Sequence, residues 1–349
     1  MKKLLSVLLI LMLTAALFAG CAGSGDAGSD AGSDAGSDAG SDAGSEEPLK
    51  VALILPGPIN DGGWSASAYA GLMMIEEDFG AEVAYNESTP ISDYDEVFRM
   101  YATSGFDIIF GHGGEFGDSA MRVAPEFPDV TFAVTSTNIV QEPNVSSIQN
   151  DNATQGFLQG VVAAVISESQ VVGAVGGMNI PSISDSIVGY EAGAKYINPD
   201  IKVLTTMTGD FEDAAKAKEI ATSMINQGAD VVMQNADHAG MGVIEAATEA
   251  GVYAIGSIGD QAELAPQTIV TSGIANMPVA FEAFVKKWME PGFKAGNYMM
   301  SVNEGVIYLA PYYEFEDKLT DEQKAKIKEV EDAIKAGTLN ARDYGDFQM

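Results

Sequence analysis

The chain has 349 residues, of which 46% are hydrophobic and 19% charged, a composition typical of globular proteins of about two domains. Its 18 basic and 50 acidic residues give a formal net charge of −32, which excludes nucleic acid as a partner and disfavours polyanionic ligands. The single cysteine, Cys21, excludes an intramolecular disulfide and a cysteine-based metal site.

The first twenty residues predict a signal peptide. Lys2 and Lys3 precede an apolar run at 4–18, which is too short to span a bilayer comfortably. Small residues then precede Cys21, as in bacterial lipoprotein signals, in which the cysteine is lipidated after cleavage; Phe18 replaces the usual leucine. The alternative is an ordinary secretory signal with an incidental thiol.

Residues 21–47 predict a disordered tether. They repeat Ser, Asp, Ala and Gly and carry almost no apolar side chains, so they cannot bury enough surface to fold. As a flexible coil this segment spans about 25–30 Å, enough to separate a membrane from a domain. A neutral repeat expansion is the alternative, and the folded part begins near Pro48.

From Pro48 onward, short apolar runs alternate with segments of helical spacing. Strands are expected at 49–55, 81–85, 106–110, 130–134, 145–149, 171–175, 201–207, 229–233, 252–256 and 268–271. Helices are expected at 65–79, 92–104, 117–125, 153–167, 184–197, 212–227 and 240–250. Nearly continuous apolar strands alternating with helices indicate parallel sheets covered on both faces. The two consecutive series predict two doubly wound α/β lobes.

The loops that follow these strands concentrate glycine, amides, carboxylates and single aromatic residues. They lie at 57–64, 111–118, 150–152, 176–185, 234–240 and 257–261. Ligands of such sheets bind outside the carboxyl ends of the strands. These loops therefore predict a cleft for a small molecule, with close backbone approach and a few fixed polar groups.

Enzyme motifs are mostly absent. The sequence has no Walker A, HExxH or GxSxG motif, and residues 111–116 lack the final glycine of a dinucleotide fingerprint. His112 and His238 cannot alone supply the three ligands of a typical catalytic zinc site, although carboxylates could complete one. We interpret each as a loop histidine that hydrogen-bonds locally. Asp237 and Asp260 suit acid–base work, but chance proximity is common among 50 acids. We expect no catalysis, no metal and no cofactor.

Several segments together resemble the basic membrane protein family, the purine-nucleoside-receptor-like lipoproteins that are substrate-binding proteins of ABC transporters. The resemblance covers 50–315 and is carried by INDGGWSASAYAGL (59–72), GHGGEFGDSAMRVAPEFPDVTFAV (111–134), DNATQGFLQGVVAAV (151–165), VGAVGGMNIPSI (172–183), the run at 198–256 and DQAELAPQTIVTS (260–272).

The resemblance implies an α/β type I periplasmic-binding-protein fold, with two doubly wound parallel-sheet lobes joined by a three-crossing hinge. The crossings are expected near 152–156, 272–277 and 302–308. Lobe one then comprises 48–154 with 274–305, and lobe two comprises 155–273 with 306–349.

The resemblance also implies the ligand site. In nucleoside-binding relatives the base lies between aromatic rings, and acidic residues hold the ribose hydroxyls, which is sound chemistry for a flat ring and a vicinal diol. The matching positions here are Asn60, Asp61, Trp64, Phe116, Asp237 and Asp260. The alternatives remain open: core packing for the two aromatic residues, and loop or cap roles for the two later aspartates.

One departure broadens the ligand class. Nucleoside-binding relatives usually carry a lysine three residues after the serine of a Thr-Ser pair, but Thr271 and Ser272 are followed by Gly273, Ile274 and Ala275. The ligand is therefore a nucleobase, a nucleoside or another flat heterocycle. A nucleotide is disfavoured, because the loops offer carboxylates and the whole chain is negative.

The sequence thus predicts an extracytoplasmic binding protein of an ABC importer, a monomer anchored to the cell membrane by lipid on Cys21. Its partners are a small uncharged ligand and separate permease and ATPase subunits. The alternatives are a sensory receptor of the same fold and a nucleoside hydrolase.

Overall fold

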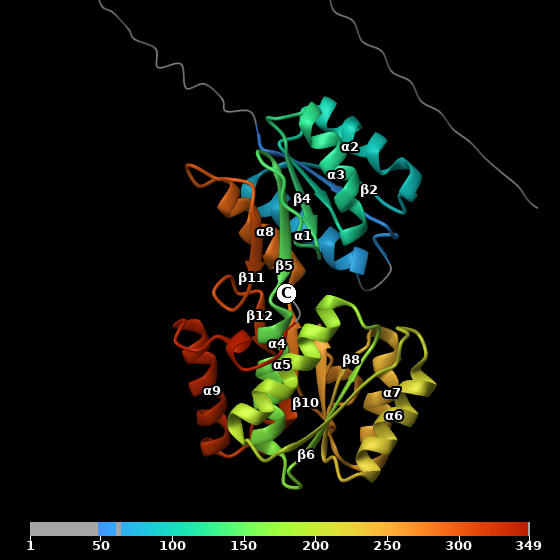
Figure 1. The fold of residues 1–349 in the computed structure, drawn as a ribbon, viewed down its shortest axis with the longest axis vertical. Helices are drawn as coiled ribbons and strands as arrows, with labels where there is room; N and C mark the ends of the chain where they lie inside the picture. The colour runs from blue at the N-terminus through green and yellow to red at the C-terminus, as the bar shows by residue number, and fades with distance from the viewer. Residues whose placement is uncertain (1–47, 61–63, 348–349) are drawn as a thin grey trace, which may run out of the picture. The chain divides into compact units, whose positions relative to one another are not determined.

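The computed structural model describes residues 48–60 and 64–347, which contain two six-stranded sheets (Figure 1). The predicted signal peptide, Cys21, the tether and Asp61 lie outside the described residues.

The first sheet has the strand order β11-β5-β4-β3-β1-β2, and all its strands are parallel. Its strands are β1 (Lys50–Ile54), β2 (Glu82–Asn86), β3 (Ile108–Gly111), β4 (Thr131–Thr135), β5 (Val145–Asn150) and β11 (Asn297–Met300). Its helices are α1 (Trp64–Phe79), α2 (Tyr94–Thr103), α3 (Gly117–Val123) and α8 (Met277–Trp288).

Alternation along β1 explains how this sheet is covered. Val51 and Leu53 share a core with α1 and α8, whereas Ala52 and Ile54 share another with α2 and α3. Successive strand residues point to opposite faces, so an unbroken apolar run serves both cores. Figure 1 shows α8 beside α1, although the two helices are far apart in the sequence.

The second sheet has the strand order β12-β10-β9-β8-β6-β7, in which only β12 is antiparallel to its neighbour. Its strands are β6 (Val171–Gly176), β7 (Lys202–Met207), β8 (Val231–Asn235), β9 (Tyr253–Ile258), β10 (Ile269–Ala275) and β12 (Ile307–Leu309). Its helices are α4 (Asn152–Ile166), α5 (Pro181–Ile197), α6 (Ala214–Asn226), α7 (Gly240–Ala250) and α9 (Asp321–Lys335). The cores place α4, α5 and α9 on one face and α6 and α7 on the other.

Short 3-10 helices lie in the connections. They are η1 (Ile91–Asp93), η2 (Gly114–Phe116), η3 (Ala124–Glu126), η4 (Asp237–Ala239), η5 (Ala262–Leu264), η6 (Tyr313–Phe315) and η7 (Ala341–Asp343). None of the helices in the described part of the chain combines the length and apolarity that a membrane span requires.

The chain passes between the two sheets after β5, after β10 and after β11, so neither sheet is built from one continuous stretch. The Ser301 hydroxyl donates to the Asp151 carboxylate over 2.8 Å, which ties the third passage to the first. The Asn276 backbone N–H donates to the Val306 carbonyl over 2.9 Å, which ties the second to the third.

Helices α4 and α5 make an unusually close contact. Gly156 and Gly160 of α4 lie against backbone carbonyls of α5, and Gly189 and Gly193 of α5 lie against backbone carbonyls of α4. Both pairs are spaced by four residues, so each pair forms a flat stripe on one side of its helix.

The sequence correctly predicted the α/β fold and every strand through β10, within a few residues at the ends. It did not predict α8, β11, β12 and α9. The start of α9 carries a capping box, in which Thr320 and Gln323 bond reciprocally to each other's backbone, and this signal was available in the sequence.

Candidate functional site

The carboxyl ends of β1 and β3 lie side by side in the first sheet. The His112 backbone N–H donates to the Ile54 carbonyl over 3.0 Å, so the loop after β3 begins next to the end of β1. Trp64 is the first residue of α1, which follows β1. This edge therefore holds the first predicted ligand loop.

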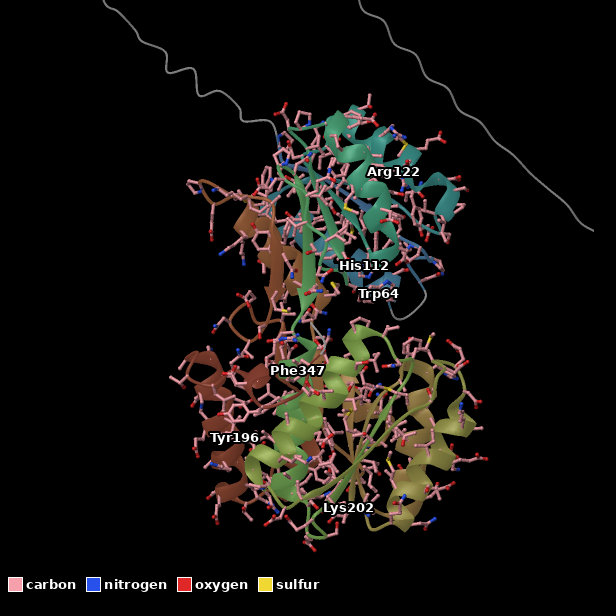
Figure 2. The ribbon with its side chains drawn as sticks, in the orientation of Figure 1. Trp64, His112, Arg122, Tyr196, Lys202 and Phe347 are labelled. Carbon is pink, nitrogen blue, oxygen red and sulfur yellow. The ribbon has the colours of Figure 1, made fainter. Side chains whose placement is uncertain are left out.

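Trp64 lies exposed at this edge on a buried support. Trp64 is 42% exposed. Its ring stacks on the His112 ring, with centroids 3.9 Å apart and planes inclined by 25°. His112 itself is fully buried. Figure 2 shows the two side chains together at one end of the first sheet. An exposed, supported indole is a suitable surface for a flat ligand.

Asn60, within this loop, is exposed, and Asp61 lies outside the described residues. The Ile59 backbone N–H donates to the Glu87 carboxylate over 2.8 Å, which links the loop after β1 to the loop after β2. The structure thus brings Asn60 to the same sheet edge as Trp64.

Phe116, expected as a second ligand-facing aromatic, is a core residue. It is fully buried, stacks on Tyr94 with centroids 3.9 Å apart, and meets Phe98 edge-on. A ring with no exposed surface cannot contact a ligand in this arrangement, so we remove Phe116 from the ligand-contact set. Gly111 permits the packing, because a β-carbon there would lie 2.7 Å from that of Phe116.

Asp237 and Asp260 follow neighbouring strands of the second sheet, β8 and β9, and both are exposed. Asp260 accepts hydrogen bonds from the Tyr313 hydroxyl over 2.6 Å and from the Ala262 backbone N–H over 3.1 Å. The hydrogen bond from the Tyr313 hydroxyl to the Asp260 carboxylate raises the pKa of Tyr313. One Asp260 oxygen is therefore already engaged by a phenol, whereas Asp237 starts η4 at the surface.

A hydrogen-bonded chain of glutamines holds these two loops together, which the sequence did not predict. The Gln234 side-chain amide donates to the Gln261 carbonyl oxygen over 2.6 Å, and that oxygen also accepts from the Ser257 N–H over 3.2 Å. The Gln261 backbone N–H donates to the Ser272 hydroxyl over 3.1 Å. A glutamine at the end of an apolar strand, as in VVMQN, was the available signal.

Of the six non-glycine residues with positive φ in the described part of the chain, four lie at or just after the carboxyl end of a strand. Ser88 and Ser136 follow β2 and β4 with φ of 53° and 56°, and Asp237 follows β8 with φ of 51°. Ile258, at the end of β9, has φ of 70° although it is β-branched, and it is 49% exposed. Such strained conformations persist only where the surrounding packing holds them, and they are common at ligand-binding sites.

Among residues 48–60 and 64–347, no group of three or more His, Cys, Asp or Glu side chains could hold a metal ion. His238 is exposed in η4, whereas His112 is buried and its ring nitrogens face Trp64 and Thr135.

The chain is similar to known proteins over most of its length. A family model described as "ABC transporter substrate-binding protein PnrA-like" matches residues 49–343. Basic membrane protein A of Borreliella burgdorferi is 30% identical over 308 residues, covering 86% of each chain. A purine-binding protein of Brucella abortus is 28% identical over 298 residues, covering 84% of this chain and 83% of the relative.

The chain is also similar to a regulatory protein by name and to a solved solute-binding protein. The transcriptional activator protein med of Bacillus subtilis is 29% identical over 279 residues, covering 80% of this chain and 87% of the relative. A solved ABC transporter solute-binding protein from Conexibacter woesei is 26% identical with a TM-score of 0.68, covering 85% of this chain and all of that one.

Proposed function

The chain belongs to the family of PnrA-like ABC transporter substrate-binding proteins, as the sequence resemblance predicted, and we propose that it captures a purine nucleoside or nucleobase for an ABC importer. The ligand lies between lobe one (48–154 with 274–305) and lobe two (155–273 with 306–349), which close on it about the three passages. The protein performs no catalysis, and separate permease and ATPase subunits supply transport.

The exposed, supported ring of Trp64 is the observation that carries this proposal. A purine is flat and polarisable and gains from offset stacking on an indole, at about 0.5–1.5 kcal/mol beyond the area it buries. Asn60 and Asp61, just before Trp64 in the chain, supply the polar contacts from the same loop.

The second lobe supplies carboxylates. Asp237 and Asp260 are exposed at the ends of neighbouring strands, and an ionised carboxylate accepts hydrogen bonds from the two hydroxyls of a ribose. The Brucella relative is named as a purine-binding protein, which supports the same ligand class. The net charge of −32 disfavours a nucleotide, because a phosphate would enter a negative field.

The amino-terminal sequence supports the location. Signal cleavage before Cys21 and lipidation of that cysteine place the domain outside the cytoplasm, tethered to the membrane by residues 21–47 as a monomer. The relative named as a transcriptional activator raises a regulatory alternative. A net charge of −32 argues against contact with DNA, so that alternative takes the form of a ligand sensor that signals through a membrane partner.

Ligand release and titration test the proposal. The protein is purified without refolding, denatured, and the released small molecules are identified by mass spectrometry. Adenosine, guanosine, adenine and hypoxanthine are then titrated calorimetrically, with ribose and AMP as controls. Tight binding of a purine without release of free base supports the proposal. Binding of none of the four purines refutes the ligand class, and release of free base from adenosine or guanosine indicates a hydrolase instead.

A further inference from the structure

The stacked pair of Trp64 and His112 is held from several directions. The His112 Nε2 atom lies 3.1 Å from the Trp64 backbone carbonyl oxygen, and its Nδ1 atom lies 3.0 Å from the Thr135 hydroxyl. Phe281 of α8 meets the imidazole edge-on, with centroids 5.8 Å apart. The imidazole therefore connects the start of α1, the end of β4 and α8.

These contacts constrain how the two ring nitrogens of His112 bond. A carbonyl oxygen can only accept, so Nε2 must donate to Trp64. When the imidazole is neutral, Nδ1 then accepts from the Thr135 hydroxyl, and the two contacts together orient the ring. Thr135 is fully buried at the end of β4, so this orientation is set from the core.

The stacking leaves the two faces of the indole in different environments. One face lies on the fully buried ring of His112, and the residue as a whole is 42% exposed. A ligand can stack only on the opposite face.

We propose that His112 is a positioning residue that holds the Trp64 ring in its ligand-ready orientation before ligand arrives; the effect on affinity rests on the proposed function. A side chain ordered in advance does not lose its freedom on binding, so the preformed support strengthens binding without a contact between His112 and the ligand.

The first arm of the test needs no ligand. The chain has two tryptophans, so Trp288→Phe leaves Trp64 as the only indole and a fluorescent reporter. His112→Ala in this background is expected to raise the acrylamide quenching constant of Trp64 about twofold, because both ring faces become accessible, and to lower its anisotropy. His112→Phe, which keeps the stack, is expected to retain most of the protection. His238→Ala is the matched control and leaves quenching unchanged.

The second arm measures affinity for adenosine, guanosine, adenine and hypoxanthine in the otherwise wild-type chain. His112→Ala is expected to weaken binding about tenfold, His112→Phe less, and Thr135→Val by an intermediate factor because it removes only the donor to Nδ1. If His112→Ala does not fold, His112→Phe and Thr135→Val carry the comparison.

The two arms separate the two proposals. Unchanged quenching and anisotropy in His112→Ala overturn the positioning role, whatever the ligand is. Increased quenching in His112→Ala, in a protein whose wild type binds no purine, supports the positioning role and refutes the proposed ligand. Increased quenching with unchanged purine affinity overturns the link between Trp64 orientation and binding.

Discussion

A β-carbon on Gly156 would overlap the backbone carbonyl oxygen of Ser186, because α4 and α5 cross with their backbones in direct contact. The contact is reciprocal, since Gly189 lies in the same way against the carbonyl of Ala153. No flexible side chain intervenes at either point, so the helices cannot yield to a larger residue.

Gly156→Ala is therefore expected to destabilise the protein by about 3 kcal/mol, the upper part of the usual range for overpacking. The measurement is urea unfolding followed by circular dichroism. Gly296→Ala is the matched control, because its β-carbon would meet only Tyr298 at an ordinary 3.6 Å and should change stability little. Equal effects of the two substitutions would show that α4 and α5 can separate without cost.

Trp64→Ala is expected to act mainly on ligand binding, and Phe116→Ala mainly on stability. Trp64→Ala should weaken purine binding at least tenfold, roughly 1.4 kcal/mol, and should cost less ligand-free stability than Phe116→Ala, since Trp64 is 42% exposed although its ring stacks on His112. Phe116→Ala should cost about 3–5 kcal/mol of stability, because it empties a site in the core. Calorimetric titration and a ligand-free thermal melt distinguish them. A large drop in melting temperature for Trp64→Ala with unchanged affinity would contradict its place in the site.

The Asp151–Ser301 hydrogen bond predicts coupling between the first and third passages. Asp151 also caps α4, accepting from the Thr154 N–H over 3.2 Å and from its hydroxyl over 2.6 Å. Asp151→Ala should cost about 1–2 kcal/mol and Ser301→Ala less, because only the former removes a cap. A double-mutant cycle should give a coupling energy of about 0.5–1.5 kcal/mol. Strict additivity would mean that this bond contributes nothing to stability.

Glu331 of α9 is expected to make a pH-dependent contribution to the free energy of unfolding, and this contribution is lost as pH rises. Burial raises the pKa of this carboxyl, more than the nearby Lys328 lowers it. A raised pKa in the folded state means that the protonated form folds more favourably. The contribution of Glu331 to stability is therefore present at pH below the ordinary pKa of glutamate, and it is lost as pH rises through the raised pKa of the folded state.

Glu331→Gln should accordingly raise the urea midpoint at pH 7, and the gain over wild type should vanish at about pH 4 and below, where Glu331 is protonated. Glu329→Gln on the same helix is the control; Glu329 is exposed and pairs with Lys326, so no such gain is expected. A gain that is the same at both pH values would show that ionisation of Glu331 is not its cause.

Cys21→Ser tests the anchor. The substituted protein should move from the membrane to the soluble fraction or the medium with its domain folded, because stable anchoring needs the acyl chains that this cysteine would carry. Fractionation after a salt wash, with immunoblotting, is the measurement. Retention of the variant in the washed membrane would contradict lipid anchoring through Cys21.

The sequence predicted the fold well because buried parallel strands are continuous apolar runs, such as the one that became β1. It did not predict β11 and β12, of four and three residues, because strands that short have no periodicity to detect. They are strands only because β5 and β10 provide edges for them.

The site was predictable only in part, for a related reason. A glycine-rich loop after a strand identifies the sheet edge, which placed Trp64 correctly at the surface. It does not tell which way a side chain turns there, so Phe116 was expected to face the ligand although it turns into the core. The support beneath Trp64 depends on Thr135 and Phe281, which are distant in sequence, so His112 was interpreted only as a local loop residue.

Strand β11 belongs to the first sheet although it follows β6 to β10 of the second sheet in the chain, and this order constrains folding during synthesis. As synthesis proceeds from the amino terminus, the first sheet lacks its last strand, and β5 keeps an open edge, until residues 297–300 have emerged. By then β6 to β10 are already complete. An unpaired edge is a template for wrong pairing, and β5 presents such an edge while the entire second series is being produced. No truncation before Met300 can yield a finished amino-terminal half.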